Sequence, residues 1–222
     1  MENFVAELEA QRVAELEAYL AITGLKDYNL TFEEEKVLKE YNSIEFSYFN
    51  IIDIFDIKNT KNILSREITN NNGKTPYLCA SAENNGVSSY INYKEEYLES
   101  GNCIFIGGKT FVVTYQENDF YSNDSHNLAL YLKEIGKKKK FNQLGLVTCI
   151  NKSLNHKYSW GNSISKTKIQ NDKILLPEKN GKPNFEFIEK FISAIQKLVI
   201  KDVVIYLDTK LQITKEVVAK TQ

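Results

Sequence analysis

Two short motifs in this sequence contain residue types that could perform chemistry. The GKT tripeptide that begins at Gly108 matches the end of a phosphate-binding loop, but such a loop also needs a following helix and a glycine where the chain has Cys103. Asp124, Ser125 and His126 are the residue types of a nucleophilic triad, but we expect these neighbouring side chains to point apart and to form no proton relay. Neither motif therefore predicts a catalytic site.

Metal and cofactor sites are not predicted either. His126 and His156 are the only histidines, and neither has a partner at the spacing of a metal-ligand pair. Cys79, Cys103 and Cys149 are too widely spaced for a structural zinc site and fit reduced thiols in a cytoplasmic protein. The sequence also lacks a glycine-rich dinucleotide loop, the Asn-Pro-Pro-Tyr-like stretch of an amino-methyltransferase and the paired-carboxylate motif of restriction nucleases. These observations favour a binding module without catalysis or cofactor.

The charge is distributed unevenly along the 222 residues, although the net charge is only −1. Residues 1–45 contain 11 acidic and 4 basic side chains, whereas residues 46–222 contain 18 acidic and 24 basic ones. DNA binding needs a local cluster of Lys and Arg rather than a basic chain as a whole, so the mildly basic body is compatible with a nucleic-acid partner. No apolar run is long enough for a membrane span, and the acidic N-terminus is unlike a secretory signal.

Polar and aromatic residues in turn-rich loops of this body are the candidates for DNA contact. Asn can pair with adenine through two hydrogen bonds, Ser can bond to bases or phosphates, and Lys binds phosphates. Singly, each has an ordinary structural alternative, because Asn-Gly pairs form turns and lysine runs are often solvated faces. Trp160 is assigned to the core. The candidates are Ser81, Asn84, Asn85, Lys109, Thr110, Tyr121, Ser122, Asn123, Lys137, Lys138, Lys139, Lys140, Lys157, Lys166 and Lys168.

Two long amphipathic helices bracket this body. The first is expected over residues 3–22 and ends at Gly24; the second is expected over residues 184–206 and begins at the cap Asn184. Both are too long to be hidden under a domain of this size, so we expect them to pack together or against another subunit; the alternative is that they cover one face of the sheet. The predicted interface residues are Val5, Leu8, Val13, Leu16, Leu20, Ile188, Phe191, Ile195 and Leu198.

Between the long helices, the sequence predicts a short helix and then strands joined by Asn- and Gly-rich turns. The short helix covers residues 31–41 with Thr31 as its cap, and a later helix is expected over residues 126–135. The lysine run is expected in a loop, and residues 143–150 fit either a helix or a strand. The predicted strands are IEFSYFNIIDIF, TPYLCAS, CIFIG and KTFVVTYQ, the last two forming a hairpin at Gly107–Gly108.

The runs at 101–132 (GNCIFIGGKTFVVTYQENDFYSNDSHNLALYL) and 157–204 resemble the target-recognition domain and following helix of type I restriction-modification specificity subunits. They are also similar to the recognition subunits of type IIB and IIG enzymes, and the opening AELEAQRVAELEAYLAITGL looks like the linker helix of this family. The resemblance implies an α/β (α+β) fold, in which a mixed-sheet recognition domain at 44–183 is flanked by long helices that form an antiparallel coiled coil. The linker helix would cover residues 1–25, an acidic connector 26–43, and the C-terminal helix and tail 184–222.

The resemblance also implies a function. Family members read double-stranded DNA without catalysis and bind adenine methyltransferase subunits through their helices; in type I systems a translocating restriction subunit joins them. They usually carry two recognition domains, whereas this sequence has one, so it is either a half-subunit that dimerises or a fragment. A homodimer would read a palindromic, gapped site. The alternatives from other classes are a small nuclease and a helical interaction module that binds no DNA.

Overall fold

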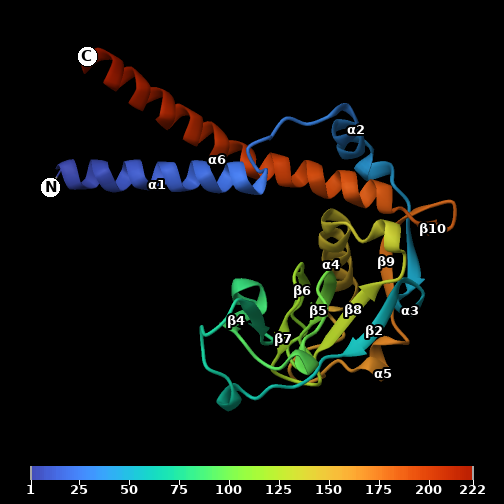
Figure 1. Ribbon diagram of the computed structural model, residues 1–222. Helices are drawn as coiled ribbons and strands as arrows, with labels where there is room; N and C mark the ends of the chain where they lie inside the picture. The colour runs from blue at the N-terminus through green and yellow to red at the C-terminus, as the bar shows by residue number, and fades with distance from the viewer. Residues whose placement is uncertain (1, 222) are drawn as a thin grey trace. The chain divides into compact units, whose positions relative to one another are not determined.

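The structure is a computed structural model that describes residues 2–221 (Figure 1). Its internal contacts divide the chain into two units. The helical unit consists of Met1–Tyr41 and Lys190–Gln222, and the sheet unit consists of Asn42–Glu189. Among the described helices, none combines the length and apolar character that a membrane crossing requires. The expected mixed α/β class is confirmed.

Three helices contribute to the helical unit: α1 (Glu2–Thr23), α2 (Phe32–Glu40) and the part of α6 (Phe185–Thr221) that follows Glu189. Helices α1 and α6 run in antiparallel directions (Figure 1). The ion pair between Glu9, near the start of α1, and Lys210, late in α6, shows this direction, with 3.0 Å between the charged atoms. The predicted antiparallel pairing is therefore confirmed. The seam between the two helices consists of Val13, Leu16, Leu20, Ile200, Val204, Leu207 and Leu211.

The predicted helix ends follow from local side-chain chemistry. Gly24 adopts φ +69° after α1, a left-handed conformation that glycine reaches without steric strain. Thr31 and Glu34 form a reciprocal capping box at the start of α2. Asn184 Oδ1 accepts a hydrogen bond from the Phe187 backbone N–H at 3.1 Å at the start of α6. All three predicted signals are confirmed.

The sheet unit contains three small sheets with the orders β1-β9-β10, β2-β8-β5-β6 and β4-β3-β7. All pairings are antiparallel except β3 with β7. The strands are β1 (Phe46–Asn50), β2 (Phe55–Asn59), β3 (Thr75–Leu78), β4 (Val87–Ile91), β5 (Cys103–Ile106), β6 (Val113–Gln116), β7 (Tyr121–Ser122), β8 (Leu128–Leu132), β9 (Lys173–Lys179) and β10 (Lys182–Pro183). The helices are α3 (Ile51–Ile54), α4 (Lys140–Leu154) and α5 (Lys166–Ile169).

The register of the four-stranded sheet defines its two ends. At one end, Ile106 of β5 lies opposite Val113 and Leu128, so the β5–β6 turn and the loop before β8 are neighbours. At the other end, Cys103 lies opposite Gln116, and Asn102 donates to the Lys138 carbonyl at 3.0 Å. We call these the turn end (residues 107–112 and 122–127) and the lysine end (residues 137–140).

Two sequence predictions of secondary structure are wrong. Residues 126–135 contain the strand β8 instead of a helix, because the LALYL run is hydrogen-bonded between β2 and β5 and a short apolar run does not distinguish the two states. The segment predicted as one strand, IEFSYFNIIDIF, is interrupted by the single turn α3, and β1 and β2 belong to different sheets.

Other boundaries differ from the predictions in extent. The predicted strand KTFVVTYQ begins only at Val113, because the hairpin turn continues through Phe111, which has a φ of +55°. Residues 143–150, left open between helix and strand, belong to α4. The run of four lysines is only partly a loop, since Lys137 closes a 3-10 turn and Lys140 begins α4.

Candidate functional site

At the turn end, the β5–β6 turn is hydrogen-bonded to three other loops. Thr110 Oγ1 donates to the Ala80 carbonyl at 3.0 Å, the Gly108 N–H donates to Asn127 Oδ1 at 2.9 Å, and the Ile164 N–H donates to the Gly108 carbonyl at 3.1 Å. Gly108 is required here, since a Cβ would lie 2.3 Å from the backbone oxygen of His126. Segments distant in the sequence are thus held as one loop cluster.

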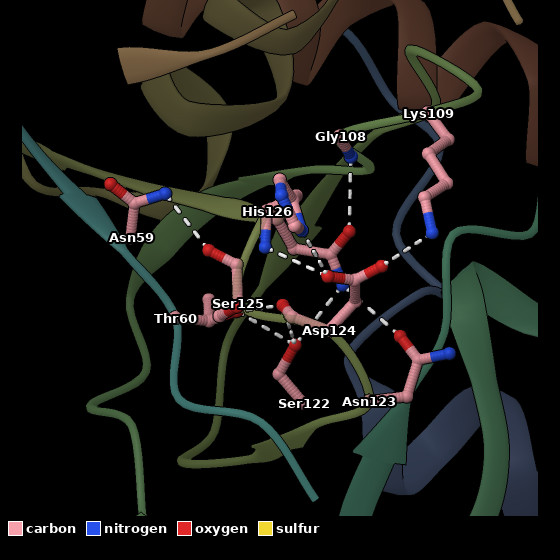
Figure 2. Close-up of polar contacts among 10 residues, drawn as sticks. Asn59, Thr60, Gly108, Lys109, Ser122, Asn123, Asp124, Ser125 and His126 are labelled. Atoms are coloured by element: carbon pink, nitrogen blue, oxygen red, sulfur yellow. Dashed lines mark hydrogen bonds and ion pairs between the residues drawn. The ribbon is translucent and has the colours of Figure 1, made fainter. Parts of the chain in front are cut away.

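Asp124 is the polar centre of this cluster, and Figure 2 shows the groups that converge on it. Its Oδ1 accepts from the His126 backbone N–H at 2.9 Å and lies 2.8 Å from His126 Nδ1, while Oδ2 lies 3.0 Å from Lys109 Nζ. Burial raises the pKa of Asp124, but the hydrogen bonds from His126 and Lys109 outweigh burial and leave its pKa below the usual value. Asp124 is therefore an anion that fixes the positions of Lys109 and the exposed His126.

The expectation that the side chains of Asp124 and His126 point apart is wrong. The backbone turns between them, so that residues two positions apart meet. Ser125 enters the network through its carbonyl, which accepts from Asn59 Nδ2 at 2.9 Å (Figure 2). The three residues thus stabilise the loop before β8.

Asn84 and Asn85 use their side-chain amides to shape a loop. Both adopt left-handed backbone conformations, with φ of 48° and 52°. Asn84 Nδ2 donates to the Val87 carbonyl at 3.0 Å, and Asn85 Nδ2 donates to the Tyr115 carbonyl at 3.0 Å. Ser81 likewise accepts from the Glu83 backbone N–H at 3.1 Å. The amide nitrogens are therefore engaged, while the residues themselves remain at an exposed turn.

Tyr121 and Ser122 are withdrawn as candidates for direct DNA contact, because both side chains are buried. Tyr121 is 4% exposed and donates its hydroxyl hydrogen to the Tyr93 carbonyl at 2.9 Å. Ser122 is 1% exposed and accepts from Thr60 Oγ1 at 2.8 Å. Asn123 is partly exposed, and its Oδ1 accepts from Asn127 at 3.1 Å. The first two side chains are too buried to reach a base edge, and the short strand that they form pairs with β3.

The predicted lysines occupy two places. The first group contains Lys109 in the β5–β6 turn, Lys157 after α4, and Lys166 and Lys168 in α5. Lys157 pairs with the buried carboxylate of Asp172, and Lys168 Nζ donates to Asn162 Oδ1 at 2.9 Å. The run from Lys137 to Lys140 lies at the lysine end, separated from the first group by the length of β5. There, Lys139 pairs with Glu189 at 2.8 Å and Lys140 pairs with Glu117 at 3.1 Å.

Trp160 is the clearest residue that the sequence reasoning misplaced. It was predicted to lie in the core, but it is 76% exposed. The neighbouring Gly161 and Asn162 are the signal that could have placed it in a turn, because Trp-Gly-Asn is bounded by serines on both sides.

The predicted interface residues of the helices fall into two groups. Leu20 is fully buried in the α1–α6 seam, which Val13 and Leu16 also join, and Ile188 is buried within the sheet unit. Phe191 stacks on Tyr41 with ring centroids 4.9 Å apart. These five side chains are used within the chain. The remaining four stay at least one-third exposed: Val5, Leu8, Ile195 and Leu198.

The chain matches the family model described as the type I restriction modification DNA specificity domain over residues 43–204. It is 30% identical over 156 residues to a protein of Heyndrickxia coagulans named type II restriction enzyme BgcI specificity subunit S.BcgI, an alignment that covers 69% of this chain and 45% of that protein. The chain thus spans less than half the length of this curated relative.

One solved structure shares the fold of this chain at low sequence identity. The S subunit of a type I restriction-modification system from M. genitalium aligns with a TM-score of 0.51 and 14% identity, covering 97% of this chain and 56% of that one. The HsdS subunit from Thermoanaerobacter tengcongensis aligns with a TM-score of 0.49 and 15% identity, covering 94% and 52%. Because the family model covers most of the sequence, the chain belongs to the type I restriction modification DNA specificity domain family.

Proposed function

We propose that this chain is a non-catalytic specificity subunit that reads a sequence in double-stranded DNA for a restriction-modification methyltransferase. The observation that carries the proposal is the loop cluster at the turn end, where three other loops are hydrogen-bonded to the β5–β6 turn and Asp124 forms an ion pair with Lys109 of that turn. Base recognition requires side chains held in a fixed geometry, and the hydrogen bonds between these loops provide that geometry. The proposed recognition domain covers residues 44–183.

The lysine end supplies the sequence-independent part of the proposed binding. Lys137 to Lys140 lie in consecutive positions before and at the start of α4, and the acidic partners of Lys139 and Lys140 are on the surface. Solvated ion pairs are weak, so phosphates can replace the carboxylates with little loss. Contacts of this kind would increase affinity for every sequence alike and would position the reading loops.

The helical unit is proposed to bind other subunits. On α6, Val199, Val203, Tyr206 and Ile213 follow one another at spacings of 4, 3 and 7 residues, and all are more than one-third exposed. Val199, Val203 and Tyr206 each precede by one position a residue of the occupied seam, namely Ile200, Val204 and Leu207. Two adjacent apolar stripes of this kind are the pattern of a helix with two neighbours. We propose a second copy of the chain as the occupant, in a homodimer with four packed helices.

The proposal extends to the partners expected of a specificity subunit. An adenine methyltransferase subunit would supply the chemistry, and in a type I system a translocating restriction subunit would join it. The three free cysteines and the DNA substrate fit a cytoplasmic protein.

Co-expression with an adenine methyltransferase subunit from the same organism tests the proposed function. The two proteins should co-purify, and sequencing should find methylated adenines at one gapped motif only when this chain is present. Cleavage of DNA by the purified chain with Mg²⁺ and no partner would instead establish a nuclease and contradict the proposal.

A further inference from the structure

Trp160 is the only tryptophan of the chain and lies at the tip of a tight turn. The Ser159 N–H donates to the Asn162 carbonyl at 3.2 Å, and the Asn162 N–H donates to the Ser159 carbonyl at 3.0 Å. These reciprocal bonds leave Trp160 and Gly161 as the two residues of the turn. The indole is 76% exposed, whereas a tryptophan usually buries a large area against other side chains.

The turn that carries Trp160 is tied to the body of the sheet unit. Asn162 Nδ2 donates to the Lys157 carbonyl at 2.8 Å, and Lys168 Nζ donates to the Ser163 carbonyl at 2.7 Å. Next to the turn, Tyr158 is 3% exposed, donates its hydroxyl hydrogen to Asp172 and packs on Phe111 at 5.4 Å between ring centroids. The exposed indole is therefore presented from a fixed base, which lowers the entropy cost of using it in binding.

The surroundings of Trp160 indicate an anionic partner. Around the turn the chain contains Lys157, Lys166 and Lys168. Lys157 is paired with Asp172, so the positive charge offered to an anion comes from Lys166 and Lys168. Lys166 and Lys168 are exposed on α5, directly after the turn. The same loop reaches the turn end through the bond from the Ile164 N–H to the Gly108 carbonyl. An aromatic ring between cations is the combination that binds nucleic acid, in which bases alternate with phosphates.

We propose that Trp160 is a base-contacting residue of the DNA interface, which inserts its indole against or between base pairs while Lys166 and Lys168 bind the flanking phosphates. This assignment rests on the proposed DNA-reading function and adds a named aromatic anchor to it. An apolar side chain can enter a groove and partly unstack a base step, and the gain from stacking is lost when the ring is removed.

The test uses the full chain and a labelled duplex that the wild-type protein has enriched from a random-sequence library. Trp160→Ala should lower the affinity for this duplex roughly tenfold or more, and Trp160→Phe should recover most of that loss. Tyr48→Ala is the matched control, since Tyr48 is 68% exposed on β1, and it should leave the affinity unchanged. Thermal unfolding should be the same for all variants, because both rings are exposed.

The single tryptophan also gives a direct optical readout. Its emission in the wild-type chain should be quenched on titration with the enriched duplex, and the Tyr48→Ala protein should behave alike. The proposal is overturned if Trp160→Ala binds the duplex with wild-type affinity and the tryptophan emission of the wild-type chain does not change on DNA binding. Loss of methyltransferase co-purification in Trp160→Ala, with DNA affinity intact, would assign the ring to a protein partner and also overturn it. If the wild-type chain, alone and with the methyltransferase, binds and enriches no duplex, the proposed function itself fails.

Discussion

The two units of the chain differ in the kind of side chain they leave exposed. The helical unit exposes apolar residues such as Val199, Tyr206 and Ile213 along one stripe, and its buried Glu34 pairs with the partly buried Lys197. The sheet unit buries most of its apolar strand residues and exposes lysines, turn amides and single aromatic rings such as Trp160 and Tyr48. An apolar stripe is suited to another protein, whereas exposed cations and amides are suited to DNA. This difference supports the proposal that the helical unit serves assembly and the sheet unit serves recognition.

The largest expected effect is on assembly through the helical unit. Val199→Glu combined with Tyr206→Glu places charges on the open stripe and should raise the dimer dissociation constant more than hundredfold, since buried unpaired charges cost several kcal/mol. Light scattering after size-exclusion chromatography measures it, with Lys201→Glu as a control off the stripe. A wild-type chain that stays monomeric at micromolar concentration, alone and with the methyltransferase, would contradict the proposed role of the stripe.

The next effect is on DNA affinity through the sheet unit. Changing Lys137, Lys138, Lys139 and Lys140 to Ala should lower affinity for all duplexes alike by about tenfold or more, and should make the dependence of affinity on salt shallower by about 0.9 per lost phosphate contact. Replacing Lys36 and Lys39 of α2 is the matched control in the helical unit and should leave affinity unchanged. A loss confined to one sequence would show that the run reads bases.

The third prediction concerns how the stability of the helical unit depends on pH through its buried carboxylate, Glu34. Burial raises the pKa of Glu34, but hydrogen bonds from Ser193, Thr31 and Lys197 outweigh it and bring the pKa to about 2. Because the folded pKa is below the unfolded value, the stabilisation is complete above about pH 4.5 and disappears as the pH falls toward 2. Glu34→Gln should lower the free energy of unfolding by about 2 kcal/mol at pH 7.

The difference between wild type and Glu34→Gln should shrink as the pH falls from about 4.5 toward 2, as chemical denaturation at several pH values can measure. Glu33→Gln is the matched control, because Glu33 is half-exposed and its ion pair with Lys190 at 3.1 Å is on the surface. A pH-independent difference would mean that the carboxylate charge does not stabilise this unit.

The smallest effect concerns the loop-shaping amides of the sheet unit. Asn85→Ala should lower stability by about 1–2 kcal/mol, because alanine is strained at a φ of 52° and the bond to the Tyr115 carbonyl is lost. Asn85→Gly loses the bond but tolerates the conformation, so it should lower stability less. Both variants should relax sequence preference. If both variants keep the wild-type stability and the wild-type DNA sequence preference, Asn85 has no role in shaping the reading loop.

The sequence predicted best the elements whose signals are local. Helix ends depend on a cap or on one glycine, so Gly24, Thr31 and Asn184 were readable, and the apolar period revealed the α1–α6 seam. The strand β8 was mistaken for a helix because its state is decided by pairing with β2 and β5, which lie far away in the sequence.

The candidate site was predictable only as a set of loops. Exposure and hydrogen-bond partners come from tertiary packing, so the sequence could not show that Ser122 is buried or that Trp160 is exposed. It also could not show that Lys109 is fixed on Asp124, since the two residues come from different loops. Residue type and spacing therefore suggest which loops are candidates for DNA contact, while packing decides which side chains are exposed.

The central claim is that the sheet unit recognises sequence, and enrichment from a random duplex library tests it most directly. The full chain with its methyltransferase should enrich one gapped, palindromic motif. Its affinity for that motif should exceed the affinity for a scrambled duplex by at least about a thousandfold at physiological salt, and both should fall as salt increases. Equal affinity for enriched and scrambled duplexes, or no enrichment at all, would contradict the account.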